Sequence, residues 1–163
     1  PTSVRLKTTA DKIWMYFPFK ANTDYRVSID YVASPKQAMY FFENQVWTQG
    51  QGKDTSHWLP SIDDVNDKII FNLEITAHEK LTVLANGKKE SEPKNLGEKR
   101  TWKYRMEKPM SSYLLAVAVG NLKKQTEISA GGIPLEYYYS AEDEEKVEPT
   151  YRYTKQIFDL VIL

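Results

Sequence analysis

Cysteine is absent from this chain of 163 residues, so disulfides and thiolate chemistry are excluded and the redox compartment cannot be read. Neither sign of charge is in excess. The 22 basic and 22 acidic residues cancel, so no net field would attract nucleic acid or an anionic membrane surface. No apolar run approaches the roughly 20 residues that cross a bilayer, and no signal peptide is evident. We expect no nucleic-acid partner and no membrane segment, and we expect the chain to begin inside a domain.

Histidine is scarce as well, with only His57 and His78 in the chain. A zinc peptidase needs two His at i and i+4 on a helix and a Glu that activates the metal-bound water. His78-Glu79 begins such a motif, but Thr82 stands at the second His position, between two strand-like patterns. We expect His78 to be a surface residue of a hairpin. No catalytic residue and no metal ligand is therefore predicted in this chain.

Aromatic residues are plentiful at 13%, with eleven Tyr, which suits sheets better than helices. The length fits one domain that buries about two-thirds of its unfolded surface. Short apolar or alternating segments with turn signals between them predict about ten strands, and hence an all-β sandwich or strongly bent sheet. The main segments are residues 4–8, 12–17, 25–31, 39–42, 69–76, 81–85, 102–106, 113–119, 122–129 and 135–139. Asn86-Gly87 is the favoured pair for a type I′ hairpin.

The end of the chain changes to a helical pattern. Tyr153, Ile157, Leu160 and Val161 recur at helical spacing, and Pro149 suits a first helical position. The helix would end on an uncapped apolar triplet, which natural helices rarely do. We therefore expect residues 1–146 to form the β-domain and residues 147–163 to start a following domain.

The segment from Thr48 to Asp64 is long for a connection between strands, and long loops are often functional. Its Trp58-Leu59-Pro60 predicts that it packs down onto the domain. Gln49 and Gln51 alternate with glycines, which let the backbone approach a ligand closely. A Gln carbonyl can accept a hydrogen bond from a free α-amino group. The alternative is that both amides only satisfy backbone groups of the loop.

Two other groups of side chains favour structural roles. Asp63, Asp64 and Asp67 could form an acid–base pair, but their spacing around Val65-Asn66 is more typical of side chains that bond local backbone in turns. The Tyr137–Tyr139 run fits strand packing with the central residue outward. A carbohydrate platform is the alternative for these tyrosines.

Four motifs in order carry a family resemblance. They are Thr48-Gln49-Gly50-Gln51 with Trp58-Leu59-Pro60, Asp63 and Asp67-Lys68, then Leu84–Gly87, then Pro109–Ala116, then Gly132–Leu135. Together they resemble the N-terminal β-domain of M1-family zinc aminopeptidases. The chain departs from the family pattern at three positions, His57, Ser61 and Val65, where Arg, Cys and Pro are frequent.

The resemblance implies a saddle-like β-domain of an enzyme that removes N-terminal residues from peptides by a zinc-activated water. The zinc ligands and general base would lie beyond Leu163, in the enzyme's own catalytic domain, which would be this domain's partner. Gln51 matches the position that binds the peptide's N-terminus, and Gln49 is the weaker candidate. Two other functions stay open: a non-catalytic scaffold relative of the family, or a free-standing β-sandwich that binds glycans.

Overall fold

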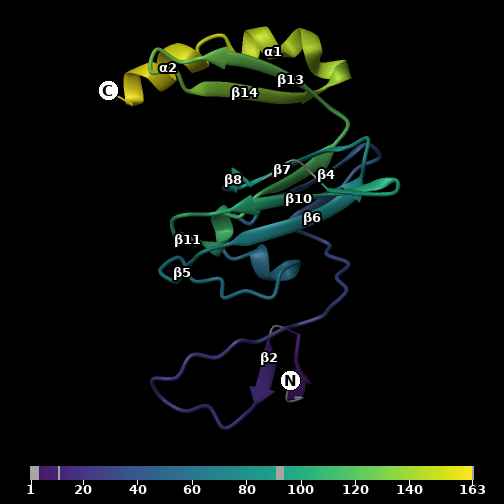
Figure 1. Ribbon diagram of the computed structural model, residues 1–163, viewed down its shortest axis with the longest axis vertical. Coiled ribbons are helices and arrows are strands. Elements are labelled where there is room, and N and C mark those ends of the chain that lie inside the picture. The colour runs from purple at the N-terminus through teal and green to yellow at the C-terminus, as the bar shows by residue number, and fades with distance from the viewer. Residues whose placement is uncertain (1–3, 11, 91–93, 163) are drawn as a thin grey trace. The chain divides into compact units, whose positions relative to one another are not determined.

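The computed structural model describes residues 4–10, 12–90 and 94–162, and Figure 1 shows its strands and helices. The chain divides into two compact units, Pro1–Val32 and Ala33–Leu163. Most of the regular structure is strand, so the prediction of an all-β fold is confirmed. No helix in the described part of the chain is long and apolar enough to span a bilayer.

The first unit contains one hairpin of two antiparallel strands, β1 (Arg5–Thr8) and β2 (Ile13–Tyr16). Beyond it, the rings of Phe17, Phe19 and Tyr25 pack edge to face with centroids 5.0–5.6 Å apart. The predicted strand over residues 25–31 is wrong, because the described residues place no neighbouring strand beside it. Alternating side chains suit a strand, but only a hydrogen-bonding partner makes one.

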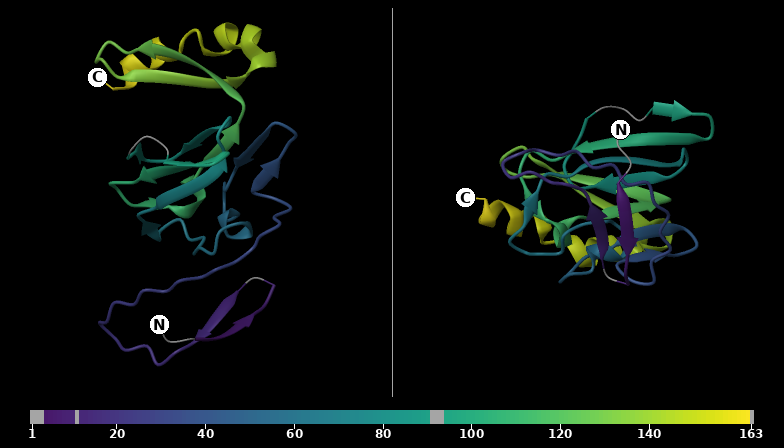
Figure 2. Two further views of the ribbon diagram at one scale, coloured as in Figure 1. Left: turned by 45° about the vertical axis from the view of Figure 1, so that its right-hand side comes forward. Right: turned by 90° about the horizontal axis from the view of Figure 1, so that it is seen from below.

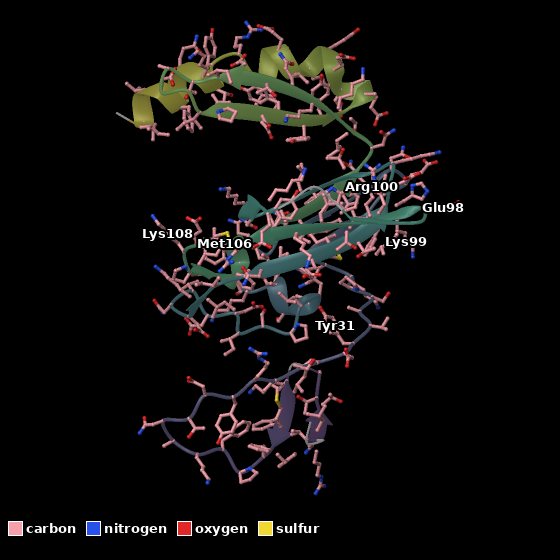
Figure 3. The ribbon with its side chains drawn as sticks, in the orientation of Figure 1. Tyr31, Glu98, Lys99, Arg100, Met106 and Lys108 are labelled. Atoms are coloured by element: carbon pink, nitrogen blue, oxygen red, sulfur yellow. The ribbon has the colours of Figure 1, made fainter. Side chains whose placement is uncertain are left out.

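Two four-stranded sheets of the second unit enclose its core. One has the order β6-β10-β8, with β9 also on β10; the other has the order β3-β4-β12-β7. The strands of the first are β6 (Asn72–His78), β8 (Lys88–Lys89), β9 (Lys94–Leu96) and β10 (Lys99–Arg105). Those of the second are β3 (Met39–Phe41), β4 (Gln45–Thr48), β7 (Thr82–Ala85) and β12 (Val117–Gly120). Figure 3 shows Lys99 at one end of β10 and Met106 just past the other.

The core joins these two sheets through alternating residues of β10. Trp102 and Tyr104 are buried and pack with Val83 of β7. The Tyr104 hydroxyl donates a 2.6 Å hydrogen bond to the Val83 carbonyl, which satisfies a polar group inside the core. The alternation of Trp102 and Tyr104 read from the sequence is thus confirmed as the inward face of a strand.

The Asn86-Gly87 turn differs from the predicted type I′ hairpin. Gly87 has φ +95°, but the only described non-glycine residues with positive φ are Asn22 and Ala38. β7 pairs with β12 and β8 pairs with β10, so this turn passes the chain from one sheet to the other. The Asn86 side-chain oxygen accepts the Ala116 N–H at 2.5 Å instead of supporting a tight hairpin.

Two long apolar segments are also divided. Residues 69–76 split into β5 (Lys68–Ile69), which pairs with β11 (Met110–Ser111), and β6, which pairs with β10. Residues 113–119 begin with a 3₁₀ turn, η2 (Ser112–Leu114), and only then enter β12. The first segment changes its pairing partner, and the second changes from a turn to a strand. Apolar periodicity along the sequence does not reveal either change.

The C-terminal part is a hairpin of β13 (Leu122–Ile128) and β14 (Pro134–Ser140), followed by the turn η3 (Ala141–Asp143) and two helices. The helices, α1 (Glu144–Tyr151) and α2 (Thr154–Val161), lie on one face of the hairpin (Figures 1 and 2). Tyr137 of β14 packs on Tyr151 with ring centroids 5.2 Å apart. The predicted helix is confirmed as α2. Pro149 lies inside α1, so its prediction as a first helical position is wrong.

Candidate functional site

The long loop between β4 and β5 begins at a tightly held point. The Thr48 side-chain oxygen accepts the Val117 N–H at 2.8 Å, and the Gln49 N–H donates to the Ala38 carbonyl at 2.8 Å. Ala38 is buried with φ +66°, a left-handed conformation that costs a non-glycine residue free energy. Backbone strain of this kind persists only where the surroundings hold it, and here it lies directly beside Gln49.

The glycine between the two glutamines is packed against the loop's own centre. A Cβ added to Gly50 would lie 2.3 Å from the Thr55 Oγ1 and 3.2 Å from the Tyr113 carbonyl oxygen. Thr55 is fully buried, and its hydroxyl donates to the Ser112 carbonyl at 3.0 Å. Gly50, the residue before Gln51, therefore packs directly against the Thr55 hydroxyl, which makes a buried hydrogen bond.

The side chains of Gln49 and Gln51 are exposed. β4 ends at Thr48, so Gln51 lies in a turn and strand alternation does not relate the two glutamines. Among the described residues, no hydrogen bond reaches either side-chain amide, although the Gln49 backbone is bonded. Substrate binding by Gln51 and Gln49 stays a prediction.

The middle of the loop packs down as the sequence predicted. Residues Thr55–His57 form the 3₁₀ turn η1, drawn in blue below β6 in Figure 1. The N–H groups of Trp58 and Leu59 donate to the Thr55 carbonyl at 3.2 and 3.0 Å, and both side chains are half-buried. The apolar side chains therefore fix the loop to the domain and leave its polar tip exposed.

Asp63 joins the two halves of the loop. One carboxylate oxygen accepts the Ser56 N–H at 2.8 Å, and the other accepts the hydroxyls of Ser112 at 2.9 Å and Ser61 at 3.1 Å. Burial would raise the pKa of the Asp63 carboxyl, but the hydrogen bonds from Ser56, Ser112 and Ser61 outweigh it and lower that pKa. Asp63 is thus held as a carboxylate by the residues that it ties together.

Asp64 behaves as a turn residue. Asp64 accepts the Asn66 N–H on its side chain at 2.9 Å, and its carbonyl accepts the Asp67 N–H at 3.1 Å. The structural interpretation is confirmed for Asp64. Ser112 was not among the predicted site residues, although the Pro109–Ala116 motif that carried the resemblance contains it.

The residues present do not fit a zinc site. His57 lies in η1 with its Nε2 2.6 Å from the Gln37 amide nitrogen, while His78 ends β6 and accepts the Lys80 N–H at 3.2 Å. Within residues 4–10, 12–90 and 94–162, no three His, Cys, Asp or Glu side chains gather as metal ligands do. The position of His78 at a strand end confirms its surface role. No step of water activation is assigned to these residues.

The first tyrosine of the β14 run has a structural role. Tyr137 is buried, packs against the tilted ring of Tyr151, and donates to Glu127 at 3.2 Å, while Tyr138 donates to Glu136 at 2.8 Å. A sugar platform needs open ring faces, and Tyr137 offers none. The prediction of strand packing is confirmed for this residue.

Comparisons with known proteins agree on one family. Residues 5–114 match the sequence profile of the Peptidase M1 N-terminal domain. Glutamyl aminopeptidase of Bos taurus is 29% identical over 114 residues, which are 69% of this chain and 12% of the bovine protein. The solved M1 zinc metallopeptidase of Deinococcus radiodurans matches with a TM-score of 0.65 and 18% identity, over 85% of this chain and 35% of that one.

A second solved structure is Legionella pneumophila aminopeptidase A in complex with aspartic acid. It matches with a TM-score of 0.60 and 21% identity, over 69% of this chain and 14% of that one. At these identities the solved structures show a shared fold. This chain spans 12–35% of the length of these three relatives.

Proposed function

Because this chain belongs to the Peptidase M1 N-terminal domain family, we propose that it is the N-terminal domain of a zinc-dependent aminopeptidase. The whole enzyme would remove single residues from the N-terminus of peptides. This domain would form one wall of the active-site cleft, with zinc and its ligands in the catalytic domain. Residues 147–163 would begin the catalytic domain and residues 1–146 would form the β-domain. The exposed apolar residues Ile157, Leu160 and Val161 of α2 support that division.

The domain's chemical role would be to bind the α-ammonium group of the substrate through Gln51. Its side-chain oxygen would accept one N–H of the ammonium, a hydrogen bond strengthened by the positive charge. The observation that carries this proposal is an exposed amide, with no hydrogen bond to it among the described residues, on a loop held by the buried Thr55–Ser112 hydrogen bond and by the Ser56–Asp63 hydrogen bond. Such an amide is available to a ligand, and its backbone is already placed.

Gln49 would contribute less than Gln51. Its backbone N–H is committed to the Ala38 carbonyl, which holds it at the strand end, whereas Gln51 lies at the turn beyond Gly50. The Legionella pneumophila enzyme was solved with aspartic acid, a molecule that has a free α-amino group. That complex supports recognition of a free amino terminus by enzymes of this fold.

The test measures kcat/KM of the full-length enzyme on an aminoacyl-anilide. Gln51→Ala should lower kcat/KM about ten- to a hundredfold, the size expected for one lost hydrogen bond to a charged group. Gln51→Glu restores an acceptor and adds a charge, so it should keep or tighten the binding of free-amine ligands. Gln49→Ala is the matched control, with a smaller effect.

The same variants are then compared with a pair of competitive inhibitors, an amino acid and its des-amino counterpart. Loss of the Gln51 acceptor should weaken the binding of the amino acid and leave the binding of its des-amino counterpart unchanged. If Gln51→Ala leaves kcat/KM within twofold of the parent, Gln51 is a loop-structuring amide and the proposed role is wrong.

A further inference from the structure

We infer that Asp63 is a positioning residue for Gln51, acting through Ser112 and Thr55. This inference rests on the proposed role of Gln51 in binding the substrate's amino group. Asp63 would not touch the substrate. It would set the place from which the Gln51 amide meets it.

The hydrogen bonds of this region close a ring. Asp63 accepts the Ser56 N–H at 2.8 Å on one oxygen and the Ser112 hydroxyl at 2.9 Å on the other. Ser112 accepts the Thr55 hydroxyl on its carbonyl at 3.0 Å, and the peptide bond between Thr55 and Ser56 completes the circuit. Two of these bonds end on a carboxylate, and charge-assisted bonds are the stronger kind.

The ring is buried where it meets the loop. Thr55 is 0% exposed and Ser112 is 2% exposed, so water does not compete for their hydrogen bond. The Ser112 Oγ also lies 3.2 Å from the Ile62 carbonyl oxygen, which is farther than its 2.9 Å to the Asp63 carboxylate. Loss of the carboxylate would therefore leave the Ser112 hydroxyl and the Ser56 N–H to find other partners.

The ring reaches Gln51 through Gly50. The Thr55 hydroxyl occupies the space where a side chain of residue 50 would stand, so the backbone of Gly50 rests directly on the ring. Among the described residues, nothing bonds the Gln51 side chain, which leaves its position to its backbone neighbours. If Asp63 no longer holds Ser56 and Ser112, then Thr55 can shift and the turn at Gln51 shifts with it.

A carboxylate that only stabilises the fold would act differently. It would lower the fraction of folded enzyme, and hence the maximal rate, without separating the inhibition constants of the two ligands. A positioning residue changes the discrimination between a ligand with an α-amino group and one without. It also loses its effect once the residue that it positions has been removed, which a double-mutant cycle detects.

The experiment uses the full-length enzyme with Asp63→Asn, Gln51→Ala and the double variant. Inhibition constants are measured for an amino acid and for its des-amino counterpart. Asp63→Asn should raise the inhibition constant of the amino acid about tenfold, which is within the range for a misplaced hydrogen bond to a charged group. It should leave the des-amino ligand nearly unchanged. In the Gln51→Ala background, the further effect of Asp63→Asn on the amino acid should vanish.

Asp64→Asn is the matched control, because this neighbouring carboxylate accepts the Asn66 N–H in the turn and, among the described residues, takes no part in the ring. Should Asp63→Asn fail to fold, Ser112→Ala removes the same side-chain bond from the other end and should give the same pattern. Equal weakening of both ligands, or full additivity with Gln51→Ala, would overturn the positioning role. No effect of Gln51→Ala on the amino acid would instead overturn the proposed function itself.

Discussion

Gly50 shows what a single side-chain position contributes to the loop. A Cβ added at Gly50 would lie 2.3 Å from the Thr55 Oγ1 and 3.2 Å from the backbone carbonyl oxygen of Tyr113. We expect Gly50→Ala to lower the free energy of unfolding by about 1–3 kcal/mol, as insertions into packed sites do. Urea unfolding at pH 7 measures the change.

Two further variants locate the cause of that loss. Gly131→Ala is the control, since the nearest atom to its added Cβ is 4.0 Å away and its change should be small. In a Thr55→Ala background the Oγ1 is gone, so Gly50→Ala should cost less than in the parent. An equal cost in both backgrounds would mean that the Tyr113 backbone, and not Thr55, excludes the side chain.

Asp63 gives the loop a dependence on pH. The pKa of its carboxyl is lowered below the ordinary 3.8 because hydrogen bonds from Ser56, Ser112 and Ser61 outweigh the effect of burial. A lowered pKa in the folded state gives stability that is complete above the unfolded pKa and is lost as the pH falls through the folded pKa. The loop should therefore loosen only under acidic conditions.

The test compares the unfolding free energies of the parent and Asp63→Asn between pH 7 and pH 3. The difference between them should be constant near neutral pH and should shrink as the pH falls below about 4. Thr126→Val, a neutral exposed change on β13, should give a difference that is independent of pH. A difference for Asp63→Asn that grows in acid would contradict the lowered pKa.

The sequence predicts the elements of this chain well where side-chain periodicity and backbone pairing coincide. The alternation of Trp102 and Tyr104 marks β10 because the inward residues form the core. The alternation over residues 25–31 is as regular, yet it forms no strand, because the described residues offer it no partner. Periodicity reports which side of a segment is apolar, and pairing depends on residues far away in the chain.

The candidate site divides in the same way. The loop, its packed Trp58 and its exposed Gln51 follow from local composition. The ring around Asp63 does not, since Asp63 and Ser112 lie 49 residues apart and meet only when η2 folds against the loop. Spacing near Asp63 pointed to turn chemistry, which is how Asp64 behaves.

Helix α2 leaves several of its apolar side chains exposed. Its residues Ile157, Leu160 and Val161 are 59–76% exposed, while a hydrogen bond from the Ala130 N–H to Asp159 at 2.9 Å ties the helix to the β13–β14 turn. A short helix without a packed apolar face is marginal in water. We expect its amide hydrogens to exchange much faster than those of β6.

Hydrogen exchange of the dilute 163-residue chain measures this difference, with β6 as the internal reference because it pairs along its whole length with β10. Fast exchange in α2 beside slow exchange in β6 is the expected result. Equal protection of the two elements would show that contacts within this chain are enough to stabilise α2.

At the scale of the whole molecule, the chain has a β-framework and a loop that buried side chains hold in place. Its charges cancel, so substrates are not drawn to it by a net field. In the described part of the chain, no set of three metal-ligating side chains gathers. The proposed function assigns to this domain the orientation of the substrate's amino terminus, and assigns the hydrolysis of the peptide bond to the catalytic domain.

We therefore expect the purified 163-residue chain to hold no stoichiometric zinc and to leave an aminoacyl-anilide intact. A catalytic zinc needs three protein ligands around one open position, and the two histidines of this chain bond Gln37 and Lys80 in separate elements. Metal analysis after dialysis and an anilide assay test both expectations, with circular dichroism to confirm that the strands have formed. One tightly held zinc per chain, or turnover lost on adding a chelator, would place the chemistry within these residues and remove the need for a catalytic domain.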